Sequence, residues 1–358
     1  MPFDDRTFPS AEAALLRRNR RRVAWWLFSV AGLIYGMVVL GGATRLTGSG
    51  LSIMEWAPIS GTFPPLSDTE WNRLFGLYQH IPQYTLLHPD MTLAGFKQIF
   101  WLEYFHRLLG RLLGMVFALP FLFFSLTGAI ERRMVPRLAL LFGLGALQGA
   151  VGWFMVSSGF FPDSTSVSAT RLVIHLSLAL TLYSAVIWAA LTTLSPIAQN
   201  FNGGTHLKHL AKATVCIVAL TILAGGYTAG LHAGLTYNSF PLMDGRLFPA
   251  GYATLSPFWH NLTQNVTAVQ FNHRLLATFT LFLVTVTVAT GIRQPNLPRP
   301  AAIALAFLGG AMMMQYGLGI ATLLSVVALP LAVMHQACAV LLLTATLGLA
   351  HSLRGALK

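Results

Sequence analysis

Charged residues are scarce in this chain: Asp, Glu, Lys and Arg make up only 9% of its 358 residues, while hydrophobic residues make up 55%. A soluble domain carries about 25% charged residues, so a soluble fold is excluded. Cysteine is almost absent. Cys216 and Cys338 lie in separate apolar runs, which excludes a disulfide framework and a cysteine-based metal site. The composition predicts an all-α integral membrane protein, because helices satisfy their own backbone hydrogen bonds in lipid.

Eight apolar stretches are long enough to cross a bilayer, which takes roughly 20 helical residues. Because eight is an even number, both ends of the chain are expected on one side of the membrane. A cleaved secretory signal would have a shorter apolar core and a small-residue cleavage site, so the first stretch is expected to remain as a transmembrane helix. The stretches are about 23–41, 99–128, 137–158, 169–193, 209–230, 268–290, 301–323 and 331–350.

The basic residues predict which side is cytoplasmic. Of the 23 Lys and Arg residues, 15 lie before the first stretch, after the last, or in the linkers on that same side. Such an excess is typical of cytoplasmic loops, so both termini are expected in the cytoplasm. The net charge of +12 therefore indicates membrane orientation, and no nucleic-acid partner is expected. The 15 residues are Arg6, Arg17, Arg18, Arg20, Arg21, Arg22, Arg132, Arg133, Arg137, Lys208, Lys212, Arg293, Arg299, Arg354 and Lys358.

Two halves of the sequence repeat four motifs in the same order. Each half holds four apolar stretches, so the halves are expected to share one orientation, as a parallel repeat of two four-helix bundles. The motif pairs are GGATRLTGSGLS (41–52) with GGYTAGLHAGLT (225–236), HRLLG (106–110) with HRLLA (273–277), LQGAVG (147–152) with MQYGLG (314–319), and IHLSLAL (174–180) with MHQACAV (334–340).

The repeat divides the chain into a basic cytoplasmic N-terminus (1–22), a first four-helix half (23–200) and a second four-helix half (201–358). Two long linkers on the outer side, about 42–98 and 231–267, are rich in Gly, Pro, Trp and Tyr. We expect them to fold back over the outer membrane face. Poorly ordered loops are the alternative for linkers of this length.

Four histidines occupy equivalent places in the second, fourth, sixth and eighth stretches: His106, His175, His273 and His335. These stretches all run from outside inward, so the four imidazoles are expected at one depth near the outer membrane face. Two imidazoles that face each other within a half can hold a haem from both sides. Zinc fits less well, because no further ligand completes a tetrahedral set in the second half. Interhelical hydrogen bonding is the alternative for each histidine taken alone.

Arg107 and Arg274 follow the first histidine of each half, and Arg111 lies one turn further on in the first half. A guanidinium group binds a carboxylate through two parallel hydrogen bonds, so these residues are predicted to bind haem propionates. The alternative is that they extend toward the lipid headgroups.

The two halves differ three residues before that histidine, where the first half has Glu103 and the second has Gln270. A spacing of three places Glu103 and His106 on one helix face. The amide keeps the shape of the side chain and removes its charge, which predicts chemistry in the first half and electron transfer in the second. An acid favoured near a helix N-terminus is the alternative.

Together these motifs resemble the haem A synthase family: GGATRLTGSGLS followed by IMEW (41–56), EYFHR (103–107), AGLTYNSFPLMDG (233–245), NHRLL (272–276) and the later histidines. The resemblance implies oxidation of the C8 methyl group of haem O to a formyl group by two successive hydroxylations. It further implies that His106 and His175 hold the iron of the substrate haem O. His273 and His335 would be axial ligands of a permanent haem b. Glu103 would be the catalytic carboxylate, stabilising positive charge or moving protons at the methyl carbon.

Some members of that family carry a cysteine pair in the first outer linker, and this chain has none, as in the proteobacterial and mitochondrial branch. Asp4, Asp5 and Glu12 argue against an organelle transit peptide, so the expected location is a bacterial inner membrane with the haem sites near the periplasmic face. The family role implies haem O synthase as a partner. It leaves open the electron donor and the number of subunits, a homo-oligomer included.

Two other functions are alternatives to haem A synthesis. The first is a di-haem membrane electron-transfer cytochrome without substrate turnover, which has no evident use for a charged residue such as Glu103 in one half only. The second is a haem transporter or chaperone. It would need a polar pathway across the bilayer, whereas the inner halves of the four histidine-bearing stretches are nearly all apolar.

Overall fold

The computed structural model describes residues 10–196 and 205–354. Within these ranges the chain is mostly helical and forms no β-strand. Asp4, Asp5, Arg6, Lys358 and the predicted boundary between residues 200 and 201 lie outside the described ranges. The long helices are α1 (Ser10–Leu46), α3 (Leu93–Leu126), α4 (Val135–Val156), α5 (Ala169–Leu194), α6 (Thr205–Gly230), α7 (Val266–Ile292), α8 (Arg299–Leu324) and α9 (Leu329–Ser352).

The eight predicted transmembrane stretches are all helices long and apolar enough to cross a membrane. Large apolar side chains cover their outward faces. Leu119 of α3, Leu140 of α4 and Phe282 of α7 are 67%, 63% and 63% exposed. Such extensive apolar faces are unfavourable in contact with water, whereas lipid chains pack against them. The prediction of a multi-pass membrane protein is therefore confirmed.

Two helices extend further than the apolar runs that predicted them. α1 begins at Ser10, so the described part of the predicted N-terminal segment is a continuous helix with the first membrane-spanning stretch. Arginine is a good helix former, and charge therefore marks the edge of the apolar run but not the end of the helix. α3 begins at Leu93, where the Thr92 hydroxyl accepts a hydrogen bond from the Gly95 amide at 3.3 Å.

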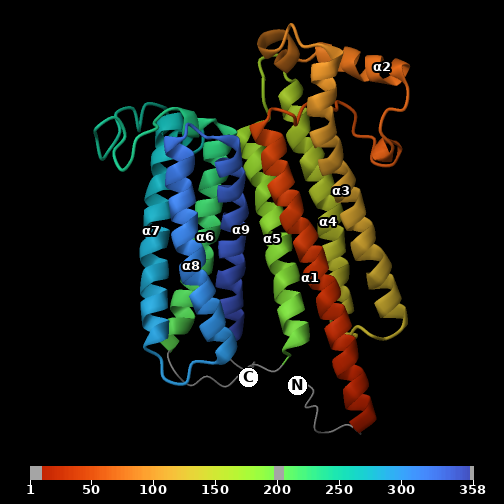
Figure 1. Cartoon of the computed structure of the whole chain (residues 1–358), viewed down its shortest axis with the longest axis vertical. Helices are drawn as coiled ribbons and strands as arrows, with labels where there is room; N and C mark the ends of the chain where they lie inside the picture. The colour runs from red at the N-terminus through yellow and green to blue at the C-terminus, as the bar shows by residue number, and fades with distance from the viewer. Residues whose placement is uncertain (1–9, 197–204, 355–358) are drawn as a thin grey trace.

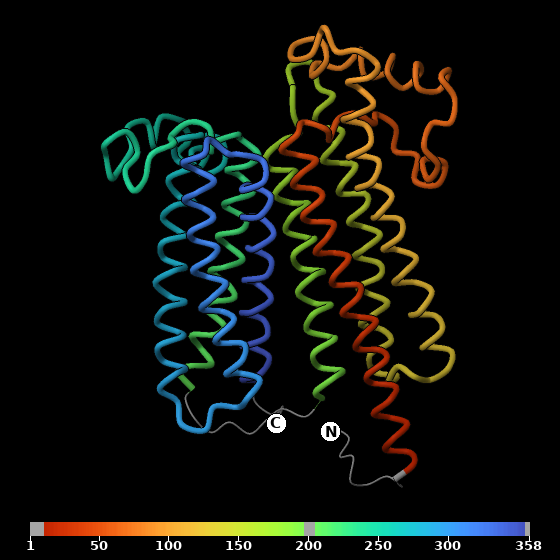
Figure 2. The backbone as a smooth tube through the Cα atoms, in the orientation of Figure 1, coloured from red at the N-terminus to blue at the C-terminus, as the bar shows by residue number. Residues whose placement is uncertain are grey.

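The helices form two groups that lie side by side (Figures 1 and 2). The first group contains α1, α3, α4 and α5, and the second contains α6, α7, α8 and α9. Contacts between the groups join α1 to α9, and α5 to both α6 and α9. Leu27 and Val186 of the first group and Leu308 and Leu343 of the second belong to one continuous apolar core. Since α1 matches α6 and α5 matches α9 in sequence motif, the contacts α1–α9 and α6–α5 would be equivalent in the predicted repeat, which stays a prediction.

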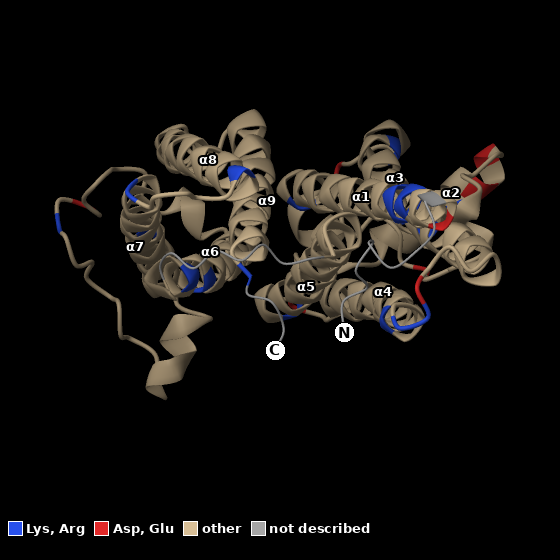
Figure 3. Cartoon of the chain, turned by 90° about the horizontal axis from the view of Figure 1, so that it is seen from below, with Lys and Arg blue, Asp and Glu red and all other residues tan. Residues whose placement is uncertain are grey.

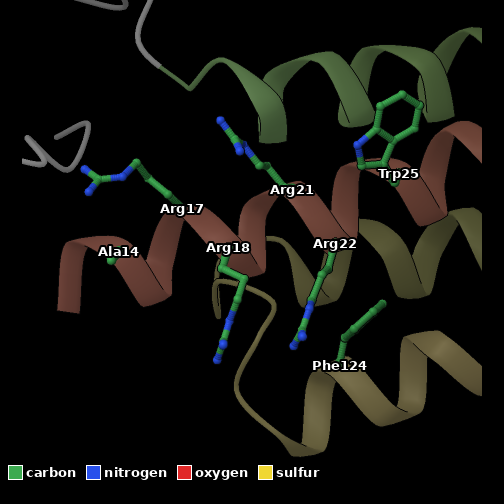
Figure 4. A pocket seen from close by; sticks show the side chains of 7 residues that line it. All are labelled: Ala14, Arg17, Arg18, Arg21, Arg22, Trp25 and Phe124. Atoms are coloured by element: carbon green, nitrogen blue, oxygen red, sulfur yellow. The ribbon is translucent and has the colours of Figure 1, made fainter. Parts of the chain in front are cut away.

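Basic residues collect at the end of the molecule where α1 begins and α9 ends (Figures 1 and 3). Arg20 is 8% exposed and donates a hydrogen bond to Glu131, at 3.2 Å, in the linker between α3 and α4. Other arginines of α1 line an open groove beside this contact (Figure 4). The groove is lined by Ala14, Arg17, Arg18, Arg21, Arg22, Trp25 and Phe124.

The first outer linker folds back onto the outward extension of α3. It contains the helix α2 (Asp68–Gln79) and the short turns η2 (Ser60–Thr62) and η3 (Gln83–Leu87). Trp71 of α2 is buried against Phe100 of α3, with ring centroids 4.8 Å apart. Tyr104 of α3 donates its hydroxyl to the Thr62 carbonyl at 2.7 Å. An aromatic core thus holds the linker against the helix that carries His106.

The second long outer linker is held by buried asparagines. It contains the short helices η5 (Ala233–Leu235) and η6 (Phe258–Leu262). A further short helix, η4 (Ser157–Phe160), lies in a different linker, directly after α4. Asn265 caps α7 by accepting from the Ala268 amide at 3.2 Å, and it donates to Asn261 at 2.9 Å and to the Gly251 carbonyl at 2.8 Å. Both long outer linkers are therefore folded, as predicted.

Arg45 joins the two groups of helices near their outer ends. Its Nη2 donates to the carbonyls of Ala229 and Gly230, at 2.7 and 3.2 Å, and lies 3.3 Å from Nδ1 of His232. The last carbonyls of a helix lack partners within that helix, so Arg45 from α1 caps the end of α6. The contact requires a neutral His232, whose unprotonated Nδ1 then accepts a hydrogen bond from the guanidinium.

We predict that this contact makes stability depend on pH. Burial and the nearby charge of Arg45 lower the pKa of His232 below its ordinary value. The unfolded chain therefore takes up the proton first, and stability falls as the pH falls through the unfolded pKa of about 6.5. Thermal unfolding in detergent should show a lower Tm at about pH 5.5 than at about pH 7.5. His232→Asn should reduce this difference, and an unchanged pH dependence in the variant would contradict the assignment.

Candidate functional site

Each of the four predicted histidines lies against a glycine of a neighbouring helix. A Cβ atom on any of these glycines would lie 2.9 to 3.0 Å from an imidazole atom, which is closer than real Cβ contacts allow without movement. Only glycine therefore lets the two helices approach this closely. The pairs are Gly41 with His106, Gly152 with His175, Gly225 with His273, and Gly319 with His335.

The histidines lie near the outer ends of their helices. His175, His273 and His335 are within about two turns of the starts of α5, α7 and α9. His106 lies further into α3 because that helix begins further out, where it packs against α2. All four side chains are partly exposed.

The second-half pair has the spacing that one shared metal ion requires. The ring centroids of His273 and His335 are 6.4 Å apart, with ring planes at 80°. A metal–imidazole bond is about 2.0 Å long, so two rings on one ion have centroids about 6 Å apart. Backbone hydrogen bonds link His273 to Thr221 of α6 and His335 to Gln315 of α8. Such bonds hold an imidazole ring in place and fix which ring nitrogen is left to bind a metal.

The first-half pair comes from α3 and α5. Gln148 of α4 donates to the His175 carbonyl at 3.0 Å and lies 3.2 Å from its Nδ1. The Oε1 atom of Gln148 is buried without a hydrogen-bond partner among the described residues, and so is Oε1 of Gln315, the matching residue of the second half. Each half thus has a glutamine beside its second histidine with an acceptor oxygen still available.

The donor set of these sites fits haem better than a bare metal ion. The residues in 10–196 and 205–354 include no group of three or more His, Cys, Asp or Glu that could hold a metal. Cys216 and Cys338 are free thiols. A structural metal ion usually needs four protein ligands, whereas haem brings four ring nitrogens and needs only axial ligands. Two imidazoles per half, each seated on glycine, satisfy that need.

Glu103 is fully engaged in hydrogen bonds. It is 3% exposed. Its Oε2 accepts from the Ser52 amide and hydroxyl at 2.7 and 2.8 Å and from the Ile53 amide at 3.0 Å. Its Oε1 accepts from Arg107 Nε and Nη2 at 3.0 and 2.6 Å. These contacts attach the start of the first outer linker to the helix turn that carries His106.

Arg107 strengthens the same attachment. Its Nη1 and Nη2 donate, both at 2.6 Å, to the carbonyls of Glu55 and Ile53. Its guanidinium also lies 5.6 Å from the ring centroid of Trp153 on α4, within the range of a cation–π contact. Trp153 in turn stacks on Trp56 of the linker at 6.3 Å. Residues 53–56 are therefore held over the outer end of the first histidine pair.

The second half repeats this attachment without the carboxylate. Arg274 donates to the carbonyls of Ser239 and Tyr237 at 2.8 and 2.7 Å, the matching positions of the repeat. Gln270 donates to the Tyr237 carbonyl at 3.1 Å. At matching positions, Glu103 accepts hydrogen bonds from its linker, whereas Gln270 donates a hydrogen bond to its own linker. The acid and the amide are thus two versions of one anchoring contact, a role that the sequence did not suggest.

The predicted propionate ligands differ in the donors they have left. Arg107 uses four of its five N–H groups on protein acceptors. Arg111 donates to the carbonyls of Pro58 and Ala57, both at 2.9 Å, but its Nη1 is buried without a partner among the described residues. The Nε atom of Arg274 is likewise buried without a hydrogen-bond partner among the described residues. Arg111 and Arg274 therefore retain donors for a carboxylate.

Sequence reasoning missed the four glycines that seat the histidines. The signal was present, because Gly41 and Gly225 match within the repeated GG motif and Gly152 and Gly319 match within the QxxxG motif. A glycine has no side chain that indicates chemistry, and its partner lies on another helix. Only the packing of the helices shows what it contacts.

Comparison with known proteins extends the motif resemblance over nearly the whole chain. A family model described as cytochrome oxidase assembly protein, COX15-CtaA, matches residues 24–347. A protein named Heme A synthase from Granulibacter bethesdensis is 57% identical over 341 residues, which cover 95% of this chain and 89% of that relative. A Heme A synthase from Nitrosospira multiformis is 45% identical over 338 residues and 94% of each chain. Heme A synthase 2 from Acidiphilium cryptum is 43% identical, covering 98% of this chain and 96% of that relative.

We predict that Glu103→Gln loosens the first outer linker. A carboxamide has one acceptor oxygen, and its NH₂ group would face N–H donors of Ser52, Ile53 or Arg107. Removing one partner of a buried ion pair costs about 3 to 5 kcal/mol, so the Tm in detergent should fall clearly. Protease cleavage within residues 53–66 should become faster.

Glu70→Gln is the matched control for this variant. Glu70 pairs with Arg73 at 2.7 Å, but both side chains are more than 40% exposed, and such surface pairs contribute about 0 to 1 kcal/mol. Equal effects of the two substitutions on Tm and on cleavage would show that Glu103 does not anchor the linker.

Proposed function

The chain belongs to the COX15-CtaA family of cytochrome oxidase assembly proteins, and from that premise we propose that it is a haem A synthase. It is an oxidoreductase that converts haem O to haem A, the activity named for relatives 43–57% identical to it over most of their length. The observation that carries the proposal is the pair of imidazoles in each half, each ring seated on a glycine of the neighbouring helix. Haem is involved in this activity as the substrate.

We place a permanent haem b in the second half, where His273 and His335 would hold its iron. The 6.4 Å separation of the two rings and the backbone hydrogen bonds that hold them support this placement. Haem iron held there would supply one-electron chemistry. Gly225 and Gly319 keep the two rings in place from the outside, so neither ring has room to turn away from the shared position.

We place the substrate haem O in the first half, between His106 and His175. Gln148 and Gly152 of α4 fix the ring of His175, and Gly41 of α1 fixes the ring of His106. Arg111, with a buried unpartnered Nη1, is the first-half residue best able to bind a propionate. Arg274 has the same capacity in the second half through its Nε.

Among the residues proposed for the first-half site, Glu103 is the one that carries a carboxylate. The five donors around it support a positioning role, in which the carboxylate holds residues 52–56 over the outer end of the site. Direct stabilisation of charge at the reacting methyl carbon, which the family resemblance implies, stays a prediction. Both roles require the carboxylate, so the Gln270 of the other half could not replace it.

We propose that the protein lies in a bacterial inner membrane with both ends in the cytoplasm and the haem sites near the periplasmic face. The arginines around the groove in Figure 4 support this orientation, because basic residues favour the cytoplasmic, anionic membrane surface. The division into residues 23–200 for the substrate and 201–358 for haem b is part of the same proposal. Haem O synthase as a partner, the electron donor and a homo-oligomer stay predictions.

Haem extraction and chromatography test the proposed function. Protein purified from cells that make haem O should contain haem b together with haem O or haem A. His273→Ala and His335→Ala should lose haem b, because each removes one of two axial ligands. His106→Ala and His175→Ala should lose haem O and haem A and form no product. His80→Ala, at an exposed position of the first outer linker, is the control. Continued haem A formation in either first-half variant would refute the proposed site.

A glycine substitution tests the seating of the rings directly. Gly319→Ala would put a methyl group 2.9 Å from Cε1 of His335. We expect the variant to bind haem b at least about tenfold more weakly, a loss of about 1.4 kcal/mol, and therefore to contain less haem b than wild type. Gly317→Ala on the same helix has nothing within 4 Å of the new methyl group. It gains the same helix propensity, and its haem b content should match wild type. Equal haem content in the two variants would contradict the seating role of Gly319.

A further inference from the structure

The two histidine sites meet at one dipeptide of α1. Gly41 lies against His106, and the adjacent Gly42 lies against Gln336 of α9. Gln336 directly follows His335 in the sequence. A Cβ atom on Gly42 would lie 1.9 Å from Oε1 of Gln336, so the glutamine occupies the place that any other side chain at residue 42 would need.

A hydrogen bond fixes this contact. Nε2 of Gln336 donates to the Val38 carbonyl of α1 at 2.6 Å. Val38 is 8% exposed and lies one turn before Gly42 on the same helix. The glutamine therefore holds α9 to α1 through one hydrogen bond and one close contact. α1 and α9 lie next to each other along the boundary between the two groups of helices (Figure 1).

The repeat supplies a second junction of the same kind, and it is apolar. Gly226 of α6 follows Gly225, which seats His273, just as Gly42 follows Gly41. A Cβ atom on Gly226 would lie 3.1 Å from Cδ2 of Leu176, the residue after His175. Leucine has no hydrogen-bond donor. The two junctions thus match in position but differ in chemistry. Of these two, the junction at Gln336 carries a hydrogen bond to the backbone of the other half, and the junction at Leu176 has an apolar side chain in its place.

We infer that Gln336 is a positioning residue that couples the two histidine sites. It ties the turn of α9 that carries His335 to the turn of α1 that seats His106, so that filling one site changes how firmly the other holds its ligand. Coupling of this kind needs a contiguous contact that both sites influence, and Gly41, Gly42 and Gln336 provide it. The inference rests on the proposed function, because it takes haem as the ligand of both sites.

Haem loss from the second site tests the coupling. Wild-type protein is purified from cells that make haem O and from cells that do not, and transfer of haem b to an excess of a haem-free globin is timed. Haem b should leave at least about fivefold more slowly when the first site is filled, the lower end of usual coupling between sites. In Gln336→Leu the two rates should be equal.

Leu176→Met is the matched control. It changes the residue after His175 at the other junction, conserves volume and leaves the Gln336 bond in place, so its ratio of rates should equal that of wild type. A wild-type ratio of one, or a Gln336→Leu ratio equal to wild type, overturns the coupling. Wild-type protein without haem b, or without haem A formation, would instead overturn the proposed function.

A double-mutant cycle tests the contact without relying on haem. Gly42→Ala should lower the Tm because its methyl group collides with Gln336, and Gln336→Ala should lower it by removing the bond to Val38. In the double variant the collision is gone, so the loss should be clearly smaller than the sum of the two single losses. Additive losses would show that Gly42 and Gln336 do not interact and would overturn the inference.

Discussion

The close approach of a helix backbone to each of four imidazoles is the constraint on which the rest of this structure depends. It needs a glycine at Gly41, Gly152, Gly225 and Gly319, because a single methyl group would lie within 3.0 Å of a ring atom. The glycines bring neighbouring helices together beside the histidines and restrict the imidazole rings. In the second half the rings of His273 and His335 face each other at 6.4 Å, so the geometry proposed for haem binding there is set by helix packing.

The two long outer linkers are hydrogen-bonded to the helices that carry His106 and His273. Arg107 and Arg274 donate to two linker carbonyls each, at matching positions of the repeat. Glu103 adds three accepted hydrogen bonds from the linker in the first half, whereas Gln270 donates one in the second. The half proposed to bind the substrate thus has its linker anchored by charge. The two halves thus share the arginine contacts to the linker and differ in the polar side chain beside them, Glu103 or Gln270.

The sequence predicted the eight membrane-spanning helices well, because the length and apolarity of a stretch decide whether it can cross a bilayer. The four histidines were found because a repeat makes equivalent positions visible. Other features could not be read in advance. The helical start of α1 at Ser10 lies beyond the apolar run, and the partners of Glu103 lie some 50 residues away in a linker without periodicity. The glycine seats and the Gln336 junction depend on contacts between helices that no local pattern records.

The central claim is that each half holds one iron between two imidazoles. Pulsed electron paramagnetic resonance on purified protein with ¹⁵N-labelled histidine tests it most directly, because it counts the histidine nitrogens bound to each ferric iron. The account predicts two bound histidine nitrogens for the haem of the second half, supplied by His273 and His335, and two for the haem of the first half, supplied by His106 and His175. A haem with one bound histidine nitrogen, or with none, in either half would contradict it.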